Sequence, residues 1–370
     1  MPDLYDAVAY GMWAYSQAAF RVETLGSPRL RLPAGTLIVA THRKESDVPI
    51  LCPPLYFRAG MRTDRPRRMH FAARDDMFLP GFFAGFPQGL PGWARRLLYP
   101  LGVRRWLPVV NVHPIRSANV ARVGEVLAAR PDAPFGELLP AEAVAPFQRR
   151  GLTATSRARD ALRGDYADLL WRAVTAADVA PGLEDFWSAH AAQAARSFRE
   201  LVELVRTPTT LVVFPEGRPS PDGEIGPLQP GIGALVRRGR PVAIQPFAFA
   251  YDPLVSGRTR VLVSLPDLVE PPDGDVEAAL LGLLRRSMPL TAGQFAAHRL
   301  LEGVEAAPGP LERELAEAVE SAQAEGRPVE PALLTVEGRR RRLAEALAVA
   351  PRKPEELAFL ALEYRSARDL

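Results

Sequence analysis

The sequence is poor in cysteine, in lysine and in long apolar runs. Cys52 is the single cysteine of the 370 residues, which excludes an internal disulfide and a metal cluster held by several cysteines. Lys44 and Lys353 are the two lysines, so arginine supplies the rest of the 46 basic residues. No uninterrupted apolar run reaches the ~18 residues of a membrane-spanning helix. The N-terminus also lacks the basic start and cleavage site of a signal peptide. We therefore expect a cytoplasmic protein.

A strong net charge is absent too. The formal net charge is +3 at pH 7, and hydrophobic residues make up 47% of the chain. A chain of this length and composition can bury a large core. The mild basic excess suits an anionic membrane surface or an anionic substrate, and it is too small to indicate a nucleic-acid partner.

Several common catalytic motifs are missing as well. The sequence has no Gly-x-Ser-x-Gly nucleophile elbow, which argues against a serine hydrolase. It has no Gly-x-Gly-x-x-Gly, no phosphate-binding loop and no cluster of metal ligands. We accordingly expect neither a metal nor a cofactor.

The stretch from Gly35 to Asp47 carries the clearest chemical signal. Residues 36–40 form a short apolar run with β-branched side chains, which predicts a buried strand, and polarity changes abruptly at His42. In an open α/β sheet, ligands bind at the ends of the strands. Five positions after His42, the Asp47 carboxylate can reach back to one ring nitrogen and leave the other free to accept a proton.

Taken alone, this His-x4-Asp pattern is short, and a surface histidine near a helix cap is the commoner explanation. A second pattern changes that balance. Residues 210–217 read Thr-Leu-Val-Val-Phe-Pro-Glu-Gly, a second buried strand that ends at Glu216 and Gly217, with Arg218 and Ser220 behind it.

In this order, the two patterns resemble the motifs of the 1-acyl-sn-glycerol-3-phosphate acyltransferase (PlsC-like glycerolipid acyltransferase) family. His42 and Asp47 match its His-x4-Asp (HX4D) catalytic motif, and residues 214–220 resemble its Phe-Pro-Glu-Gly-Thr-Arg-Ser motif. One departure stands out, because here Arg218 follows Gly217 directly and Pro219 comes next. The resemblance covers about residues 30–270.

Three further segments resemble the family pattern. Residues 69–76 are similar to a strand ending in Ala-Lys, with Arg74 at the lysine position. Gly102, a predicted strand at 107–112 and Arg116 are similar to the second motif, a glycine before a strand that ends in arginine. Pro246, inside a predicted strand at 242–250, is similar to the fourth motif, a proline near the acceptor pocket.

The order of the elements predicts an α/β fold, with a largely parallel central sheet flanked by helices. We expect an N-terminal interfacial helical segment over residues 1–30 and an acyltransferase domain over 31–305. Proline-rich and helical stretches between about 131 and 200, such as 156–177 and 184–206, predict a helical insertion. Residues 306–370 should form a helical C-terminal extension, whose charges on 311–325 and 354–368 are most simply solvated.

Two segments combine aromatic and basic or interfacial character. The helix expected over residues 4–20 carries tyrosines and a tryptophan, which suits either a membrane interface or packing on the core. Residues 78–101 place aromatic side chains among glycine, proline and arginine, which favours a lipid-docking segment over a simple cover of the sheet edge. We expect peripheral association with the inner face of the cell membrane.

The resemblance implies a transferase of phospholipid biosynthesis. His42 would deprotonate an acceptor hydroxyl that attacks an acyl thioester, with Asp47 supporting the imidazole and Glu216 positioning the acceptor. Arg116, Arg74 and Arg218 would hold an acceptor phosphate, Gly217 would place backbone N–H groups near the oxyanion, and Pro246 would line the acceptor pocket. The acceptor implied is lysophosphatidic acid.

Two alternatives stay open: an O-acyltransferase for a non-phosphorylated glycolipid or carotenoid-sugar hydroxyl, and a non-catalytic protein that binds a lipid surface. The sequence does not choose between acyl-CoA and acyl carrier protein as the donor. It also leaves open the acyl chain length and the oligomeric state.

Overall fold

The computed structural model describes residues 3–26, 32–58, 62–64, 67–78, 84, 91–99, 101–102, 104–178, 182–304 and 308–368. The fold is mixed α/β, as the order of the sequence elements predicts. Its central sheet has seven strands in the order β1-β11-β10-β2-β9-β5-β6. The pairs that the structure describes are parallel except β10 with β11, which is antiparallel. The expected fold class, a largely parallel sheet with flanking helices and a helical C-terminal region, is confirmed.

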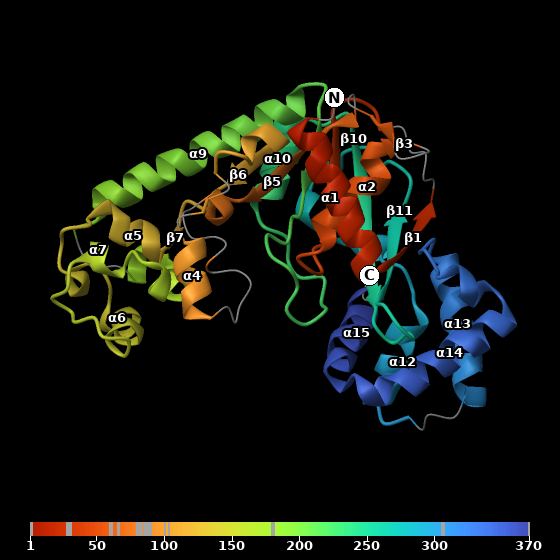
Figure 1. The fold of residues 1–370 in the computed structure, drawn as a ribbon. Helices are drawn as coiled ribbons and strands as arrows, with labels where there is room; N and C mark the ends of the chain where they lie inside the picture. The colour runs from red at the N-terminus through yellow and green to blue at the C-terminus, as the bar shows by residue number, and fades with distance from the viewer. Residues whose placement is uncertain are drawn as a thin grey trace. The chain divides into compact units, whose positions relative to one another are not determined.

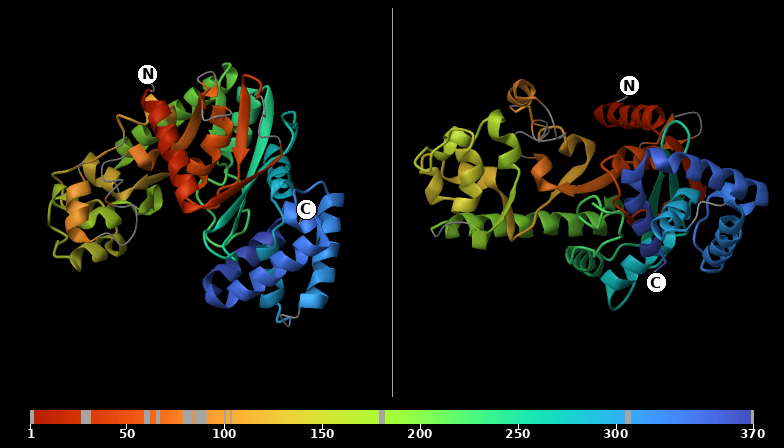
Figure 2. Two further views of the ribbon diagram at one scale, coloured as in Figure 1. Left: turned by 45° about the vertical axis from the view of Figure 1, so that its right-hand side comes forward. Right: turned by 90° about the horizontal axis from the view of Figure 1, so that it is seen from below.

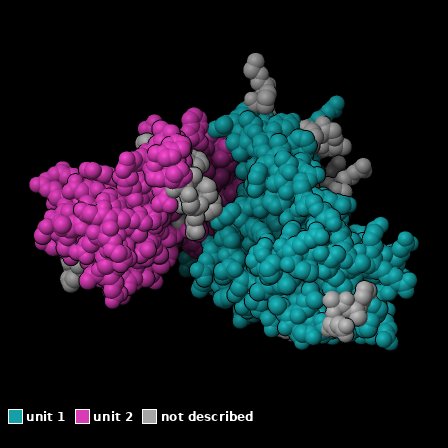
Figure 3. Space-filling model, turned by 60° about the horizontal axis from the view of Figure 1, so that its bottom comes forward, with its two compact units in different colours: residues 1–70, 203–370 teal, residues 71–202 magenta. Residues whose placement is uncertain are grey.

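The chain divides into two compact units (Figure 3). Unit 1 contains residues 1–70 and 203–370, and unit 2 contains residues 71–202. The C-terminal residues 306–370 thus belong to the same unit as the strands that carry the two motifs.

The strands of unit 1 are short and mostly buried. They are β1 (Arg21–Gly26), β2 (Thr36–Ala40), β9 (Thr210–Val213), β10 (Ala243–Asp252) and β11 (Arg260–Leu265). Every residue of β2 and β11 is buried. A strand with both faces covered needs a continuous apolar run, and this is the pattern that the sequence has at residues 36–40. A separate two-stranded sheet pairs β3 (Phe57–Arg58) with β4 (Arg62–Thr63) in antiparallel fashion.

The N-terminal helix α1 (Leu4–Ala19) packs onto the rest of unit 1. It begins at a capping box formed by Asp3 and Asp6. The Tyr5 hydroxyl accepts a hydrogen bond from the Met69 backbone N–H at 3.0 Å, and its ring lies 5.1 Å from the ring of Tyr56 on α2 (Asp47–Tyr56). Near the end of α1, Tyr15 is 49% exposed, and its ring lies 6.0 Å from the ring of Phe20. The helix therefore packs onto unit 1 and still carries a partly accessible aromatic side chain.

Two more helices complete the sheet layer of unit 1, α10 (Gly231–Gly239) and α11 (Val276–Ser287). The C-terminal helices are α12 (Ala292–Leu301), α13 (Pro308–Ala324), α14 (Val336–Val349) and α15 (Pro354–Ser366). They gather at one end of the strands in Figure 1 and stay together in both views of Figure 2.

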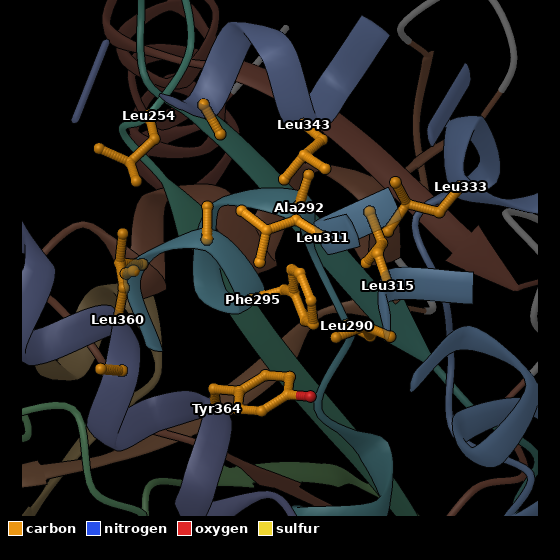
Figure 4. Close-up of a cluster of buried hydrophobic side chains, with 14 of the residues drawn as sticks. Leu254, Leu290, Ala292, Phe295, Leu311, Leu315, Leu333, Leu343, Leu360 and Tyr364 are labelled. Carbon is orange, nitrogen blue, oxygen red and sulfur yellow. The ribbon is translucent and has the colours of Figure 1, made fainter. Parts of the chain in front are cut away.

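A separate apolar cluster holds these C-terminal helices together. Figure 4 shows Phe295 of α12 beside Tyr364 of α15, and their ring centroids are 6.1 Å apart. The cluster also contains Leu254, which follows β10, so it joins the helices to the sheet. A buried ion network adds to this link, because Arg342 on α14 bonds Asp252 at the end of β10 at 2.8 Å.

Unit 2 has its own apolar core, built around Phe135 and Phe147. Its strands are β6 (Val112–Ile115), β7 (Val120–Arg122), β8 (Ala173–Thr175) and most of β5 (Met69–Arg74). Its α-helices are α4 (Gly92–Leu98), α5 (Val123–Ala129), α6 (Ala141–Gln148), α7 (Ala158–Ala161), α8 (Ala167–Leu170) and α9 (Glu184–Arg206), whose last residues belong to unit 1. Short 3-10 helices occur at Asp75–Phe78, Pro108–Val110, Phe135–Glu137, Gly164–Tyr166 and Ala176–Asp178 in this unit, and at Pro331–Leu334 and Ala350–Arg352 in unit 1.

Two predicted elements of unit 2 are wrong in detail. Residues 107–112 do not form a strand, because Pro108 starts a 3-10 turn that ends at Asn111 with a φ of +60°. The strand β6 begins only at Val112. Residues 156–177 are broken into α7, α8, β8 and short turns instead of one long helix. Residues 79–83, 85–90 and 100 of the aromatic segment lie outside the described residues.

Candidate functional site

The two motifs meet because their strands are neighbours. β2 and β9 run parallel, with Val39 in register with Val213. The chain therefore leaves both strands at the same edge of the sheet, and His42 follows one strand as Glu216 follows the other. On the other side of β2, Pro246 of β10 is buried and in register with Val39.

Thr41 fixes the point where β2 ends. Its backbone N–H donates to the Phe247 carbonyl at 3.0 Å, and its hydroxyl accepts from the Phe249 N–H at 3.1 Å. The next residues turn away from the sheet, and α2 begins at Asp47 after Ser46. His42 is thus placed on a short turn between two rigid elements.

Asp47 is fully buried and receives four hydrogen bonds. Its Oδ2 accepts from the backbone N–H groups of Arg43 at 2.6 Å and Lys44 at 3.0 Å, and it lies 3.0 Å from Nδ1 of His42. Its Oδ1 accepts from the Tyr251 hydroxyl at 2.7 Å. Both carboxylate oxygens of Asp47 thus accept hydrogen bonds from protein donors.

An ionised carboxylate can only accept hydrogen bonds, so Nδ1 of His42 donates to Asp47, and in the neutral ring Nε2 is then the acceptor. The His42 side chain is 14% exposed, and its ring packs against Phe214 with centroids 4.6 Å apart. Within the described residues, the ring is hydrogen-bonded to Asp47 alone. No described serine, threonine or cysteine therefore stands ready as a protein nucleophile at Nε2.

Glu216 is tied directly to this turn. Its Oε1 accepts a hydrogen bond from the His42 backbone N–H at 2.7 Å, and only 7% of the residue is exposed. Burial raises the pKa of Glu216, and the nearby Arg43 guanidinium partly opposes that rise. The Glu216 carboxylate thus fixes the backbone of His42, and its burial costs desolvation free energy.

The segment after Glu216 is a tight turn. Gly217 has a φ of +75°, a region that strongly favours glycine, and its N–H donates to the Phe214 carbonyl at 3.0 Å. A Cβ at Gly217 would lie 3.1 Å from Cγ of Gln229, whose N–H holds the Pro215 carbonyl at 2.8 Å. The Gly217 N–H is therefore engaged inside the turn.

Arg218 and Ser220 continue this segment. The Arg218 side chain is exposed, and it makes no ion pair with any residue that the structure describes. The Ser220 N–H donates to the His42 carbonyl at 2.8 Å, which ties the second motif back to the first.

Two residues of this region were not singled out from the sequence, Arg43 and Glu363. The Arg43 side chain is fully buried, and its Nε donates to Glu363 Oε1 at 3.0 Å. We expected the charges of 354–368 to be solvated, and for Glu363 this is wrong, because its side chain is also fully buried. A signal was present: Glu363 lies on the same helical face as Leu360, Tyr364 and Ala367, all of them apolar.

Arg74 and Arg116 belong to unit 2 and are described there by themselves. They lie at the same ends of two parallel strands, since Arg74 is in register with Ile115. The Arg116 guanidinium bonds Asp75 at 2.8 Å, Glu125 at 3.2 Å and Gln193 at 2.9 Å. Its N–H groups are therefore directed at protein acceptors.

Among the described residues, no three His, Cys, Asp or Glu side chains gather in a way that could hold a metal ion. What the unit 1 site offers is an oriented imidazole with an accepting Nε2, a buried carboxylate behind it and an exposed guanidinium in the same segment. Such a site can take a proton from a bound hydroxyl group.

No family model and no curated protein matches this chain. Among solved structures, the chain is similar to the 1-acyl-sn-glycerophosphate (LPA) acyltransferase PlsC from Thermotoga maritima, at 13% sequence identity and a TM-score of 0.36. The similarity covers 75% of this chain and 77% of that chain. A likeness at this level does not carry function.

Proposed function

We propose that this chain is an acyltransferase that moves a fatty acyl group from an acyl thioester to a hydroxyl of a lipid acceptor. The observation that carries the proposal is the His42–Asp47 pair, with Nδ1 held at 3.0 Å and Nε2 left as an acceptor. A general base without a protein nucleophile suits direct attack by a substrate hydroxyl.

The chemistry balances without any further reagent. His42 Nε2 takes the proton of the acceptor hydroxyl as its oxygen bonds to the thioester carbonyl carbon. The tetrahedral intermediate then collapses, the C–S bond breaks, and the imidazolium returns the proton to the departing thiolate. Asp47 stabilises the imidazolium, and Glu216 keeps the His42 backbone in place.

For the acceptor we propose lysophosphatidic acid. Arg218 is exposed and lies two positions after Glu216, so its guanidinium is available for a phosphate. In unit 2, Arg74 and Arg116 remain candidates for a phosphate contact, although a phosphate at Arg116 would compete with Asp75 and Glu125. We propose that Pro246 lines the acceptor pocket.

An alternative acceptor is a non-phosphorylated hydroxyl, as on a glycolipid or a carotenoid sugar. The observation that favours it is the full set of protein partners around Arg116. Kinetics with lysophosphatidic acid beside monoacylglycerol separate the two. We expect wild type to prefer the phosphorylated acceptor, and Arg218→Ala to raise its KM about 10-fold or more, the value of one charge-assisted contact. Equal use of both acceptors by wild type contradicts the phosphate proposal.

We further propose peripheral association with the inner face of the cell membrane. The apolar side chains of Trp93 and Leu97 lie four positions apart on α4 and are 71% and 66% exposed. Arg96, 70% exposed and paired with Asp165 at 2.6 Å, lies beside them on the same short helix. This combination suits anionic lipid. Within the described residues, no helix is long and apolar enough to cross a bilayer.

The experiment that tests the function directly is a screen of lipid acceptors with one labelled acyl chain, offered as acyl-CoA and as acyl carrier protein thioester. Acyl transfer that depends on His42 supports the proposal. Lipid binding without transfer to any acceptor would favour the second alternative, a non-catalytic lipid-surface protein.

A further inference from the structure

The C-terminal helix α15 contacts the turn that contains His42. Arg43, the residue after His42, is the contact point, and its side chain is fully buried. Its Nε donates to Glu363 of α15 at 3.0 Å. Its NH1 lies 3.9 Å from Glu216 Oε2. One guanidinium therefore touches both the C-terminal helix and the second motif.

The loop after the second motif is fastened to the same helix. The Arg43 guanidinium donates to the carbonyls of Gly223 and of Glu224, the latter at 3.2 Å. The Ile225 N–H donates to the Ser366 hydroxyl of α15 at 2.9 Å. A Cβ at Gly223 would collide with the Phe359 carbonyl of α15, so the two backbones approach closely.

The second carboxylate oxygen of Glu363 is bound by a residue of α12. Its Oε2 accepts from the Gln294 side chain on α12 at 2.7 Å, and Gln294 is itself fixed by a capping box with Thr291. The ring of Phe359 covers the Arg43 guanidinium at 5.4 Å. The chain of contacts thus runs from the C-terminal cluster to the backbone of the His42 turn.

We propose that Arg43 and Glu363 are positioning residues, through which α15 sets the geometry of the His42–Asp47 pair. The link to the pair is short, because the Arg43 N–H donates to the same Asp47 oxygen that holds the His42 ring. A buried pair of full charges costs desolvation that an apolar pair would avoid. The Arg43–Glu363 pair instead fixes one position of the turn. That position matters, because a shift of about 1 Å at a reacting group can cost about 100-fold in rate.

Removing the Glu363 charge tests this. In Glu363→Gln, the Arg43 guanidinium loses its closest charged partner and moves toward Glu216. We expect kcat to fall about 10- to 100-fold, with the KM for the acyl donor unchanged. The matched control is Glu355→Gln, which removes an exposed carboxylate from the first turn of the same helix.

The kinetic measurement rests on the proposed acyl transfer, so a second measurement follows the protonation state of the His42 ring directly. The chain has five histidines, and nitrogen NMR of histidine-labelled protein assigns His42 by the signal that His42→Ala removes. Wild type should show the tautomer protonated at Nδ1. Glu363→Gln should shift the His42 signals or mix the tautomers, whereas Glu355→Gln should leave them unchanged.

The outcomes separate the two proposals. A folded Glu363→Gln protein with wild-type kcat and wild-type His42 signals overturns the positioning role. If wild type transfers no acyl group but Glu363→Gln still alters the His42 signals, the positioning role stands and the proposed function does not.

If Glu363→Gln fails to fold, the double variant Arg43→Gln with Glu363→Gln replaces it, because it removes both charges of the buried pair together, while Glu216 keeps its hydrogen bond from the His42 N–H. Altered His42 signals in this folded, neutral pair support the role, and wild-type signals overturn it.

Discussion

Replacing Asp47 by asparagine isolates the contribution of the negative charge that faces the His42 ring. The carboxylate accepts from two backbone N–H groups, from the His42 ring and from the Tyr251 hydroxyl. An asparagine oxygen in the Oδ2 position keeps the backbone bonds and the ring bond. Its NH2 group then faces Tyr251, whose hydroxyl can turn to accept. The geometry of the turn survives while the charge is lost.

The expected fall in kcat follows from the hydrogen bond that the protonated His42 ring would donate to the Asp47 carboxylate. A hydrogen bond to a charged group is worth about 1.5–3 kcal/mol, and about 1.4 kcal/mol corresponds to a tenfold change in rate. Asp47→Asn should therefore lower kcat about 10- to 150-fold, with the KM of both substrates nearly unchanged. Asp47→Ala is a poor substitute, because it leaves buried N–H groups without partners at a cost of about 1–3 kcal/mol each.

The assay is release of the free thiol from an acyl thioester in the presence of the lipid acceptor, followed at saturating substrate. Circular dichroism and thermal unfolding establish that the variant is folded. A folded Asp47→Asn protein with wild-type kcat would refute the view that the buried charge supports the base.

Three other variants test separate features. Burial raises the pKa of Glu216 above its ordinary value of 4.5, so the folded chain binds this proton more readily than the unfolded chain does. At pH values above 4.5 the unfolded chain ionises this carboxyl group more easily, and the buried carboxylate therefore lowers the stability of the folded state. Glu216→Gln should raise the melting temperature at neutral pH, a gain that should shrink as pH falls toward about 4.5; an equal gain at every pH would contradict this cause. Gly217→Ala places a Cβ at positive φ and should lower the free energy of unfolding by about 1–2 kcal/mol in urea titrations; unchanged stability would contradict the strained turn. Trp93→Ala with Leu97→Ala should weaken flotation with anionic vesicles about tenfold or more, while the exposed Leu301→Ala serves as the control and should float as wild type does.

The paired motifs could be predicted from the sequence because their signals are local. The apolar run at 36–40 and the run ending at Val213 each describe a strand buried on both faces, and the structure has both. Their adjacency follows from parallel α/β topology, which puts the strand ends at one edge. The proximity of His42 and Glu216 could thus be predicted from the sequence alone.

Other features depend on partners far away in the chain, which local patterns do not contain. Glu363 contacts Arg43 across more than three hundred positions, and charged residues on an amphipathic helix are far more often solvated. The strand β1 was not predicted, because it lies at the edge of the sheet and none of its residues is fully buried. Its sequence therefore has neither an apolar run nor a clear alternation of polar and apolar residues. In unit 2, Pro108 and Asn111 favour a turn, but the apolar residues around them resemble a strand.

In the proposed function, His42 is the base for acyl transfer to a lipid hydroxyl. The most direct measurement compares wild type and His42→Ala for transfer of one labelled acyl chain to lysophosphatidic acid. His42 lies on a turn at the edge of the sheet, so its loss should leave the fold intact and lower the rate about 10²- to 10⁴-fold. Near-wild-type transfer by a folded His42→Ala protein would contradict the account.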